Sequence, residues 1–254
     1  MADKIELTNR IVLRSVLPLF KVIYDEGKES SKGVDGIVQF AVKDSDKGAY
    51  LEFSGGNLDV KQGIHSNPDV TISFKSVEDM NGMFTGKTVV PSVKGFSHIK
   101  LLLKLVPLFL GLTLLMPNKN PKAPKKREFK VKLLMYMVTN ALSQLNKGGD
   151  EDMMAWTAKM PDRIFQLSVQ PEGPAAYLRV KVGKTKSGHG IYTKKAPFIH
   201  MMFQGIDGAY AVIAEGKDTV EAMGDGEIRV DGSPESAGML GSFMKRIESL
   251  LMPK

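Results

Sequence analysis

Hydrophobic and polar residues alternate in several short runs of this chain, which is the pattern of strands with one buried face. The runs lie at Ile37–Val42, Ala49–Phe53, Asp69–Phe74, Ile164–Val169, Ala176–Val180 and Glu227–Gly232. KDSDKG and QPEGP separate the first two runs of each set and are rich in turn-forming residues. These neighbouring strands are therefore expected to form hairpins.

Longer segments with an apolar residue every three or four positions predict helices in each half of the chain. They are Thr8–Tyr24, about Lys130–Leu145, and a last helix that begins after Ser233-Pro234 and runs to Leu251. A further short helix is expected before Gly86-Lys87. Because strands are grouped in the middle of each half and helices lie at its ends, the pattern predicts an α+β fold rather than alternating βαβ units.

The sequence also contains an internal repeat. When the chain is shifted by half its length, Ile37–Ile64 falls on Ile164–Ile191, and nine of the 28 aligned positions are identical. Average composition would give about two identities by chance. The offset of 127 in this segment grows to 129 at Phe74 and Phe203 and to 130 at Gly86 and Gly216, so small insertions separate the copies. The order never reverses, which indicates two copies of one domain.

Several stretches in combination resemble the sterol carrier protein type two (SCP-2) family of lipid-binding domains. The first is NPDVTISFKSVEDMNGMFTGK at Asn67–Lys87; the others are APFIHMMF and Ala214–Leu240, which contains GEIRVDG. The resemblance implies two tandem copies, each a five-stranded, mostly antiparallel sheet packed by helices that encloses an apolar cavity for acyl chains or sterols. Pro91 precedes the expected last strand of the first copy, so that strand is predicted to be short or distorted.

We place the first domain at 1–117 and the second at 118–254, which the chain enters through a basic, Pro- and Lys-rich linker at 117–132. The formal charge of the chain is +7, and the linker supplies seven cations against one carboxylate. Its prolines predict that its first part is an extended, solvated connector.

Three interpretations of the linker charge stay open: a soluble connector, contact with anionic lipid headgroups or another acidic surface, and contact with nucleic acid. We expect no nucleic-acid partner, because Phe129 is the single aromatic residue among these cations. The headgroup candidates are Lys119, Lys122, Lys125, Lys126 and Arg127.

The most apolar stretch is Ile99–Met116, in which all but five of the side chains are apolar. A transmembrane helix is disfavoured because Lys100 and Lys104 lie in its first third and Pro107 and Gly111 interrupt it. A core helix buried on all sides and a helix that lines a lipid cavity, or is partly exposed as its lid, are the other two interpretations. The position of the stretch in the resemblance favours the last. An apolar helix followed by clustered lysines also suits transient docking on an anionic membrane.

Composition and motifs narrow the chemistry. Hydrophobic residues make up 43% and charged residues 25% of the 254 residues, as in ordinary globular domains. The chain has no cysteine, which excludes disulfides and thiolate sites and fits a reducing compartment. The four histidines lack ligand-like spacing, and no nucleophile elbow, dinucleotide fingerprint, phosphate loop or calcium loop is present. We expect no cofactor, no metal and no catalytic residue, in a cytoplasmic protein that can lie at a membrane periphery.

These features predict a non-enzymatic protein that binds and carries hydrophobic lipids such as fatty acyl chains and sterol-like or polycyclic lipids. The expected lining residues of the first copy are Phe74, Met80, Met83, Phe84, Leu101, Leu105, Leu108 and Leu112, and those of the second are Phe203, Tyr210, Met223, Met239, Leu240, Phe243 and Ile247. The fifteen methionines suit an adaptable pocket, although they also serve as ordinary core residues. Two other classes stay open: an enzyme or accessory domain that presents a hydrophobic substrate in the same cavity, and a structural module without one. The sequence leaves the ligand and the oligomeric state open.

Overall fold

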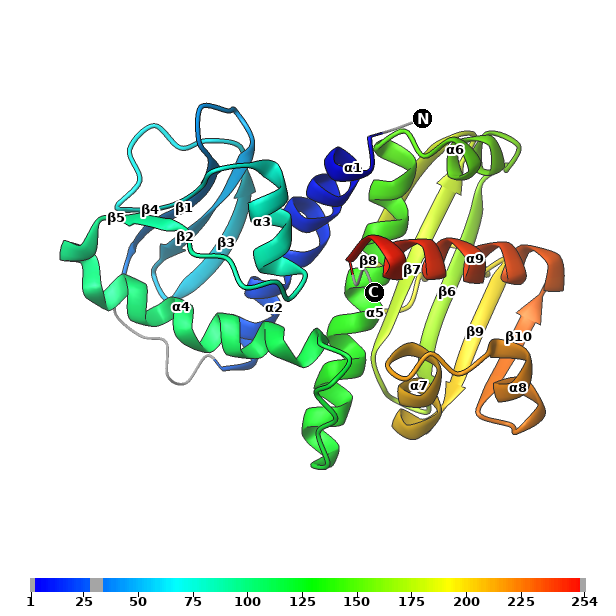
Figure 1. Ribbon diagram of the computed structural model, residues 1–254. Helices are drawn as coiled ribbons and strands as arrows, with labels where there is room; N and C mark the ends of the chain where they lie inside the picture. Colours follow the sequence, from blue (N-terminus) through cyan, green and yellow to red (C-terminus); the bar gives the residue numbers. More distant parts are fainter. Residues whose placement is uncertain (1–2, 28–33, 252–254) are drawn as a thin grey trace. The chain divides into compact units, whose positions relative to one another are not determined.

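The computed structural model describes residues 3–27 and 34–251, which divide into an N-terminal unit up to residue 116 and a C-terminal unit from residue 117 onward (Figure 1). The N-terminal unit begins with two helices joined by a π-helical turn. Its elements are α1 (Lys4–Ile11), the turn Val12–Val16, α2 (Leu19–Glu26), β1 (Gly36–Val42), β2 (Gly48–Ser54), β3 (Asn57–Gln62), β4 (Val70–Phe74), α3 (Val77–Phe84), β5 (Ser92–Lys94), a 3-10 turn (Phe96–His98), α4 (Ile99–Leu112) and a 3-10 turn (Thr113–Leu115).

The C-terminal unit has the same order of strands with more helix around them. Its elements are α5 (Pro124–Lys147), α6 (Glu151–Ala158), β6 (Arg163–Gln170), β7 (Ala175–Lys181), β8 (Lys184–His189), β9 (Ile199–Gln204), α7 (Gly205–Ile213), α8 (Thr219–Gly224), β10 (Ile228–Gly232) and α9 (Pro234–Leu251). The sheets run β3-β2-β1-β4-β5 and β8-β7-β6-β9-β10. In each sheet the central pair (β1 with β4, β6 with β9) is parallel and the other pairs are antiparallel. The predicted α+β class and mostly antiparallel sheets are confirmed.

Strand registers repeat with the offsets seen in the sequence. Val38 pairs with Leu51 in the first sheet, and the equivalent residues Phe165 and Leu178 pair in the second. Across the parallel pair, Val38 lies opposite Val70 and Phe165 lies opposite Ile199, so the insertion between the copies falls before β9. Since a slip of one residue would turn every side chain to the other face, the shared register places equivalent residues on equivalent faces.

A buried glutamine makes the same hydrogen bonds in both units. The Gln39 Nε2 group donates to the carbonyls of Phe40, Ala49 and Gly63, and its Oε1 accepts from the His65 N–H. Gln166 repeats this at the equivalent positions of the second copy, with the carbonyls of Leu167, Ala176 and Gly190 and the Tyr192 N–H. A buried side chain of this kind fixes the loop that leaves β3 or β8, because each partner would otherwise lose a hydrogen bond.

A glycine lies at the end of the last strand of each unit for a steric reason: Gly95 follows β5 directly and Gly232 is the last residue of β10. Gly95 and Gly232 have φ values of 90° and 120°, and a Cβ on them would lie 2.1 and 2.2 Å from the carbonyl oxygens of Asp69 and Phe198. Only glycine allows this close approach of two backbones. As predicted from Pro91, β5 is short, with three residues.

Two helix predictions need correction. The predicted helix Thr8–Tyr24 is broken by the π-helical turn and by Pro18, which cannot donate an N–H to the preceding turn. The second helix, predicted at about Lys130, begins at Pro124, because a proline is well suited to the first position of a helix. Lys125, Lys126 and Arg127 therefore lie on α5, and the irregular connector is limited to residues 116–123.

The core of each unit lies between one face of its sheet and the helices. On β4 the alternate residues Val70, Ile72 and Phe74 are buried, as are Ile199, Met201 and Phe203 on β9. In the N-terminal unit α2 and α3 pack on the sheet and α4 packs on α2, whereas in the C-terminal unit α5, α6 and α7 pack on the sheet. In Figure 1, α9 crosses the strands of the second sheet.

Candidate functional site

Four phenylalanine rings from four elements meet in the interior of the N-terminal unit. Phe20 of α2, Phe40 of β1, Phe84 of α3 and Phe109 of α4 have ring centroids 5.2–6.3 Å apart in all six pairs. Most of these contacts are edge to face or tilted, which are favourable geometries for aromatic pairs. The cluster joins the sheet to α2, α3 and α4. We refer to these rings as the phenylalanine cluster.

The predicted lining residues of the first copy are almost all buried, and one of them, Phe84, belongs to the phenylalanine cluster. Seven of the eight are buried and Met83 is half-buried; the buried ones are Phe74, Met80, Phe84, Leu101, Leu105, Leu108 and Leu112. The four leucines are spaced four, three and four residues apart, so they form one stripe on the inner side of α4. Phe20 and Phe109 were not among the predicted lining residues, although both lie in helical segments with apolar periodicity.

Side chains occupy the place where the cavity of the first copy was predicted. The phenylalanine cluster and the inner leucines of α4 fill the space between sheet and helices, where the cavity was expected. The physical reason is that atoms around an empty apolar void lose their dispersion contacts, so these side chains pack against one another. The arrangement is an apolar interior lined by aromatic and leucine side chains.

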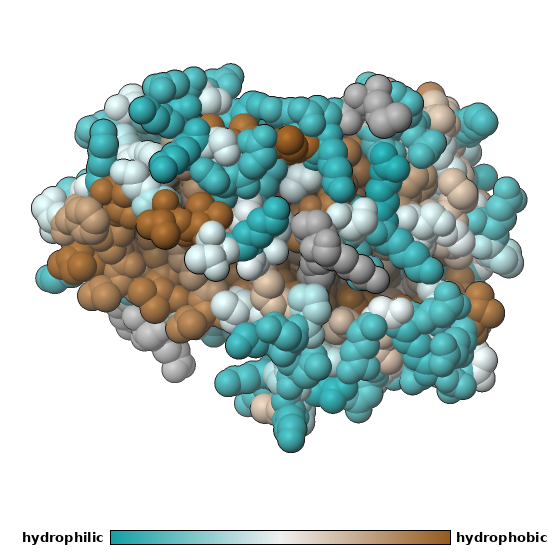
Figure 2. All heavy atoms as spheres, in the orientation of Figure 1, coloured by the Kyte–Doolittle hydropathy of each residue, from teal (hydrophilic) through white to brown (hydrophobic). Residues whose placement is uncertain are grey.

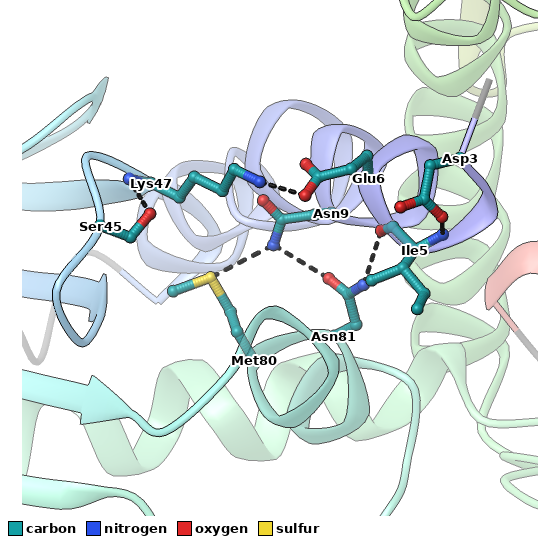
Figure 3. A network of polar contacts seen from close by, with 8 residues as sticks. All are labelled: Asp3, Ile5, Glu6, Asn9, Ser45, Lys47, Met80 and Asn81. Carbon is teal, nitrogen blue, oxygen red and sulfur yellow. Dashed lines mark hydrogen bonds and ion pairs between the residues drawn. The ribbon is translucent and has the colours of Figure 1, made fainter.

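Polar contacts hold one side of this interior. Asn9 of α1 donates from Nδ2 to the Met80 sulfur at 3.5 Å and to the Asn81 Oδ1 at 3.0 Å, and Asn81 donates to the Ile5 carbonyl (Figure 3). Nearby, Lys47 forms an ion pair with Glu6. Met80 is fully buried, so a predicted lining residue is fixed by a junction between α1 and α3.

The C-terminal unit places its predicted lining residues in two environments. Phe203, Tyr210, Leu240, Phe243 and Ile247 are at most 3% exposed. Met223 and Met239, in contrast, are 47% and 38% exposed, so these two do not line the interior. Their places on the outer sides of α8 and α9 explain the difference. Trp156 of α6, which was not predicted, contacts Phe165 and Phe243 with ring centroids 5.1 and 5.4 Å apart.

An open hollow of about 400 Å³ lies elsewhere in the C-terminal unit. It is lined by Asn146, Lys147, Met154, Gly183, Lys184 and Thr185. Asn146 bonds the Gly183 carbonyl and the hydroxyls of Thr157 and Thr185, so its polar atoms serve the packing of α5, α6 and β8. None of the predicted lining residues contributes to this hollow.

The candidate headgroup-binding residues are either exposed or in contact with other side chains. Lys119, Lys122, Lys125 and Lys126 are exposed. Arg127 instead forms a 2.9 Å ion pair with Asp207 and lies 4.2 Å over the Tyr210 ring. Lys130, which lies on the same helix, is 1% exposed and donates from Nζ to the Lys119 carbonyl, and burial lowers its pKa.

The outer side of α4 is also apolar. Ile99, Leu103, Val106 and Leu110 are 55%, 60%, 52% and 63% exposed, and Phe96 just before them is 68% exposed. Figure 2 shows the corresponding band of hydrophobic atoms over α4. By length and composition Phe96–Leu115 is sufficient to cross a membrane, but 28% of it is buried inside the protein. The interpretation as a core helix buried on all sides is wrong, because only one side of α4, with the inner leucines and Phe109, faces the core.

Polar chemistry in the described residues is sparse. The His200 Nε2 lies 2.8 Å from the Ser168 Oγ, and burial lowers the pKa of His200. Ser168 alternates along β6 with Phe165, Leu167 and Val169, so this pair lies on the sheet face opposite the apolar interior. No group of three or more His, Asp or Glu side chains in the described part of the chain could hold a metal ion.

Comparison with known families matches a segment of the N-terminal unit. Residues 19–94, which run from α2 through β5, match the family model of the SCP-2 sterol transfer family. The comparison with curated proteins gave no match.

Solved structures with a similar arrangement include two SCP-2 proteins. Palmitated SCP2L2 from Aedes aegypti is 16% identical, with 42% of this chain and 90% of that chain covered and a TM-score of 0.31. Sterol carrier protein 2 from Yarrowia lipolytica, in its apo form, is 14% identical, with 47% and 93% covered and a TM-score of 0.33. The sec-alkylsulfatase Pisa1 from Pseudomonas sp. is 11% identical, with 63% of this chain but 30% of that enzyme covered and a TM-score of 0.27.

Proposed function

Because residues 19–94 form a domain of the SCP-2 sterol transfer family, we propose that this chain binds and carries hydrophobic lipids within its apolar interior. The observation that carries the proposal is that the segment matched by the family model contains three of the four residues of the phenylalanine cluster. The match includes Phe20, Phe40 and Phe84, and α4, which follows it, supplies Phe109 and the inner leucines. Fatty acyl chains and sterol-like or polycyclic lipids are the ligand classes that suit this lining.

We infer that ligand entry separates the inner side of α4 from α2 and from the other rings of the phenylalanine cluster. Burial of four leucines stabilises the closed form by about 6–12 kcal/mol, at about 1.5–3 kcal/mol for each side chain. A bound chain of about fourteen methylenes regains a similar amount, at about 0.8 kcal/mol per methylene. The closed and lipid-filled forms are therefore comparable in energy, and the length of the acyl chain decides which is favoured.

The C-terminal unit is proposed to hold lipid in the corresponding place. Its sheet has the same strand order, and its predicted lining residues include the buried side chains Phe203, Tyr210, Leu240, Phe243 and Ile247. Lys119, Lys122, Lys125 and Lys126 are exposed and available to anionic headgroups, whereas Arg127 would have to exchange its contact with Asp207.

We propose carriage without catalysis. The alternative is an enzyme, or an accessory domain of one, that presents a hydrophobic substrate in the same interior. The Ser168–His200 pair does not favour it, since the pair lies on the face of the second sheet opposite the buried residues Phe165, Leu167 and Val169. Incubation with acyl esters and acyl thioesters separates the two: release of free acid at a catalytic rate would support the enzyme.

The test is binding of fatty acids of eight to eighteen carbons to the full-length chain, measured by displacement of a fluorescent fatty acid and by mass spectrometry of lipid extracted from the purified protein. Affinity is expected to rise about tenfold for each two methylenes until the interior is filled. Absence of both uptake and co-purified lipid would overturn the proposal.

Two matched phenylalanine variants locate the site. Phe84 is 7% exposed and Phe96 is 68% exposed, and both belong to the N-terminal unit. Phe84→Ala should change fatty-acid affinity several-fold, while Phe96→Ala should leave it unchanged. If Phe84→Ala does not fold, Phe84→Leu keeps most of the volume and takes its place.

A further inference from the structure

The apolar outer side of α4 forms one continuous stripe. Ile99, Leu103, Val106 and Leu110 follow one another at intervals of four, three and four residues and are each more than half exposed. At about 3.6 residues per turn this stripe lies nearly opposite the inner stripe of leucines. Contiguous exposed apolar surface of this kind marks a site of interaction in a protein. We refer to these four residues as the outer stripe.

The charge around the outer stripe identifies the partner. From Met80 to Arg127 the chain has nine lysines and arginines and no aspartate or glutamate. Two of these cations, Lys100 and Lys104, are on α4 itself, along one edge of the outer stripe. Lysines beside an apolar helix face can extend toward headgroups while the stripe contacts acyl chains.

The same charge disfavours a second copy of this chain as the partner. Face-to-face contact of two outer stripes would bring together two segments that each carry nine cations and no carboxylate. Like charges at an interface oppose association. An anionic lipid surface supplies both an apolar layer and the opposite charge.

The inner stripe disfavours a membrane-spanning helix. Leu101, Leu105, Leu108 and Leu112 are 2–7% exposed because they pack in the core of the N-terminal unit. A spanning helix would have to withdraw all four from that core. A helix that lies in the plane of the membrane surface keeps them in place.

We propose that the outer stripe of α4 docks this protein on anionic lipid bilayers, with α4 parallel to the surface and Lys100 and Lys104 at headgroup level. The inference adds a membrane as a partner of the proposed lipid carrier. Docking itself does not depend on the carrier function, which only explains what docking would serve. Docking through α4 would place the membrane beside the helix that has to move when a lipid enters the interior.

The test is flotation of the full-length chain with vesicles of phosphatidylcholine and phosphatidylglycerol (3:1), compared with pure phosphatidylcholine. Binding to the anionic vesicles is expected to be at least tenfold tighter and to weaken as salt is raised. The double variant Leu103→Glu/Leu110→Glu should lose at least tenfold in binding. Lys100→Gln should lose about fivefold on anionic vesicles alone.

The matched control is Val182→Glu/Val220→Glu. These valines are 66% and 77% exposed and lie in the C-terminal unit, so the control adds the same two charges away from α4. It should bind vesicles nearly as the unmodified chain does. Because all four positions are exposed, thermal unfolding should confirm that both double variants fold.

Three results would overturn the proposal. The first is equal flotation of the two double variants, and the second is a bound protein that resists high salt and alkaline carbonate, as expected of a spanning helix. The third is dimerisation of the chain that Leu103→Glu abolishes while vesicle binding stays unchanged. Uptake of monomeric fatty acid is measured on the same variants. Docking without uptake would refute only the carrier function, and uptake without docking would refute only this inference.

Discussion

The two units end on helices that have similar inner faces and contrasting outer faces. Both α4 and α9 follow the last strand of a sheet and bury a stripe of large apolar residues. Outside that stripe α4 presents the outer stripe, whereas α9 presents Lys245, Arg246 and Glu248. The surrounding charge also differs, since Tyr210–Leu251 contains eight carboxylates and four cations while Met80–Arg127 contains no carboxylate. After duplication, the buried side of a covering helix stays under the constraint of the core, and its free side can acquire a separate role.

The way α9 is held illustrates the contrast. Its Arg246 Nε lies 2.5 Å from the Asp150 Oδ2, and Asp150 is 1% exposed and caps α6 through the Met153 N–H. On α4, Phe109 and the inner leucines supply the apolar contacts. Ionic contacts are directional and dispersion contacts are not, so α4 is the helix better suited to shift over a ligand.

The largest expected effect tests whether the inner faces are equivalent. Leu105→Ala on α4 and Phe243→Ala on α9 should lower the free energy of unfolding by about 2–5 and about 3–5 kcal/mol, because each leaves a cavity in a packed core. Leu103→Ala and Met239→Ala, on the outer sides of the same helices, should change it by less than about 0.5 kcal/mol. Urea titrations measure all four. Equal costs for inner and outer residues on either helix would contradict the division into faces.

The next effect tests whether the duplicated glutamines are equivalent. Gln39→Leu and Gln166→Leu each remove hydrogen bonds to three carbonyls and one N–H, so each should cost about 1–3 kcal/mol of unfolding free energy. Hydrogen exchange at the His65 and Tyr192 amides should accelerate in the respective variant. A large loss of unfolding free energy in one variant and none in the other would show that the two glutamines do not stabilise their units equally.

The third prediction tests whether the ion pair between Arg246 and Asp150 stabilises α9. Arg246→Ala leaves the buried Asp150 carboxylate with one partner fewer and should cost about 1–3 kcal/mol. Lys245→Ala is the control, since Lys245 is largely exposed and 3.9 Å from Asp218, and it should cost less than about 0.5 kcal/mol. Similar melting temperatures for both variants would show that the ion pair does not stabilise α9.

The smallest effect is a dependence of the C-terminal unit on pH. Burial is the main cause that lowers the pKa of both His189 and His200; Lys132 adds to the shift at His189, and Asp231 opposes it at His200. A histidine with a lowered folded pKa binds a proton more readily when unfolded, so stability is lost as the pH falls below about 6.5 toward the folded values.

The first copy supplies the matched substitutions. Gln62 and Thr71 stand at the positions that correspond to His189 and His200. In His189→Gln/His200→Thr, protection of the β6 amides against hydrogen exchange should therefore depend less on pH between 7 and 5. An unchanged pH dependence of protection would show that groups other than these two histidines cause it.

Much of the fold could be predicted because the repeat and the alternating strands are properties of local sequence. Edge strands β3 and β8 were missed, since their faces are largely polar and their periodicity is weak. The start of α5 at Pro124 was missed because a proline among lysines is equally typical of a connector. Local pattern does not determine which half of a helix packs against a sheet.

The site was predicted less completely for the same reason. Position in the repeat correctly located buried residues such as Phe84 and Phe243, but Met223 and Met239 lie on outer helix faces. Whether apolar residues surround a void or fill it depends on their tertiary packing, which periodicity does not contain. The outer stripe could have been read from the two sets of apolar residues on α4, each spaced at helical intervals.

The most direct measurement uses the absence of cysteine from the chain. Single cysteines placed in turn along Ile99–Leu112 and carrying an environment-sensitive fluorophore report where each side of α4 meets lipid. We expect positions 105 and 108 to respond to monomeric fatty acid, and positions 103 and 110 to respond to anionic vesicles. Responses that ignore this division, or no response to fatty acid at any position, would contradict the account.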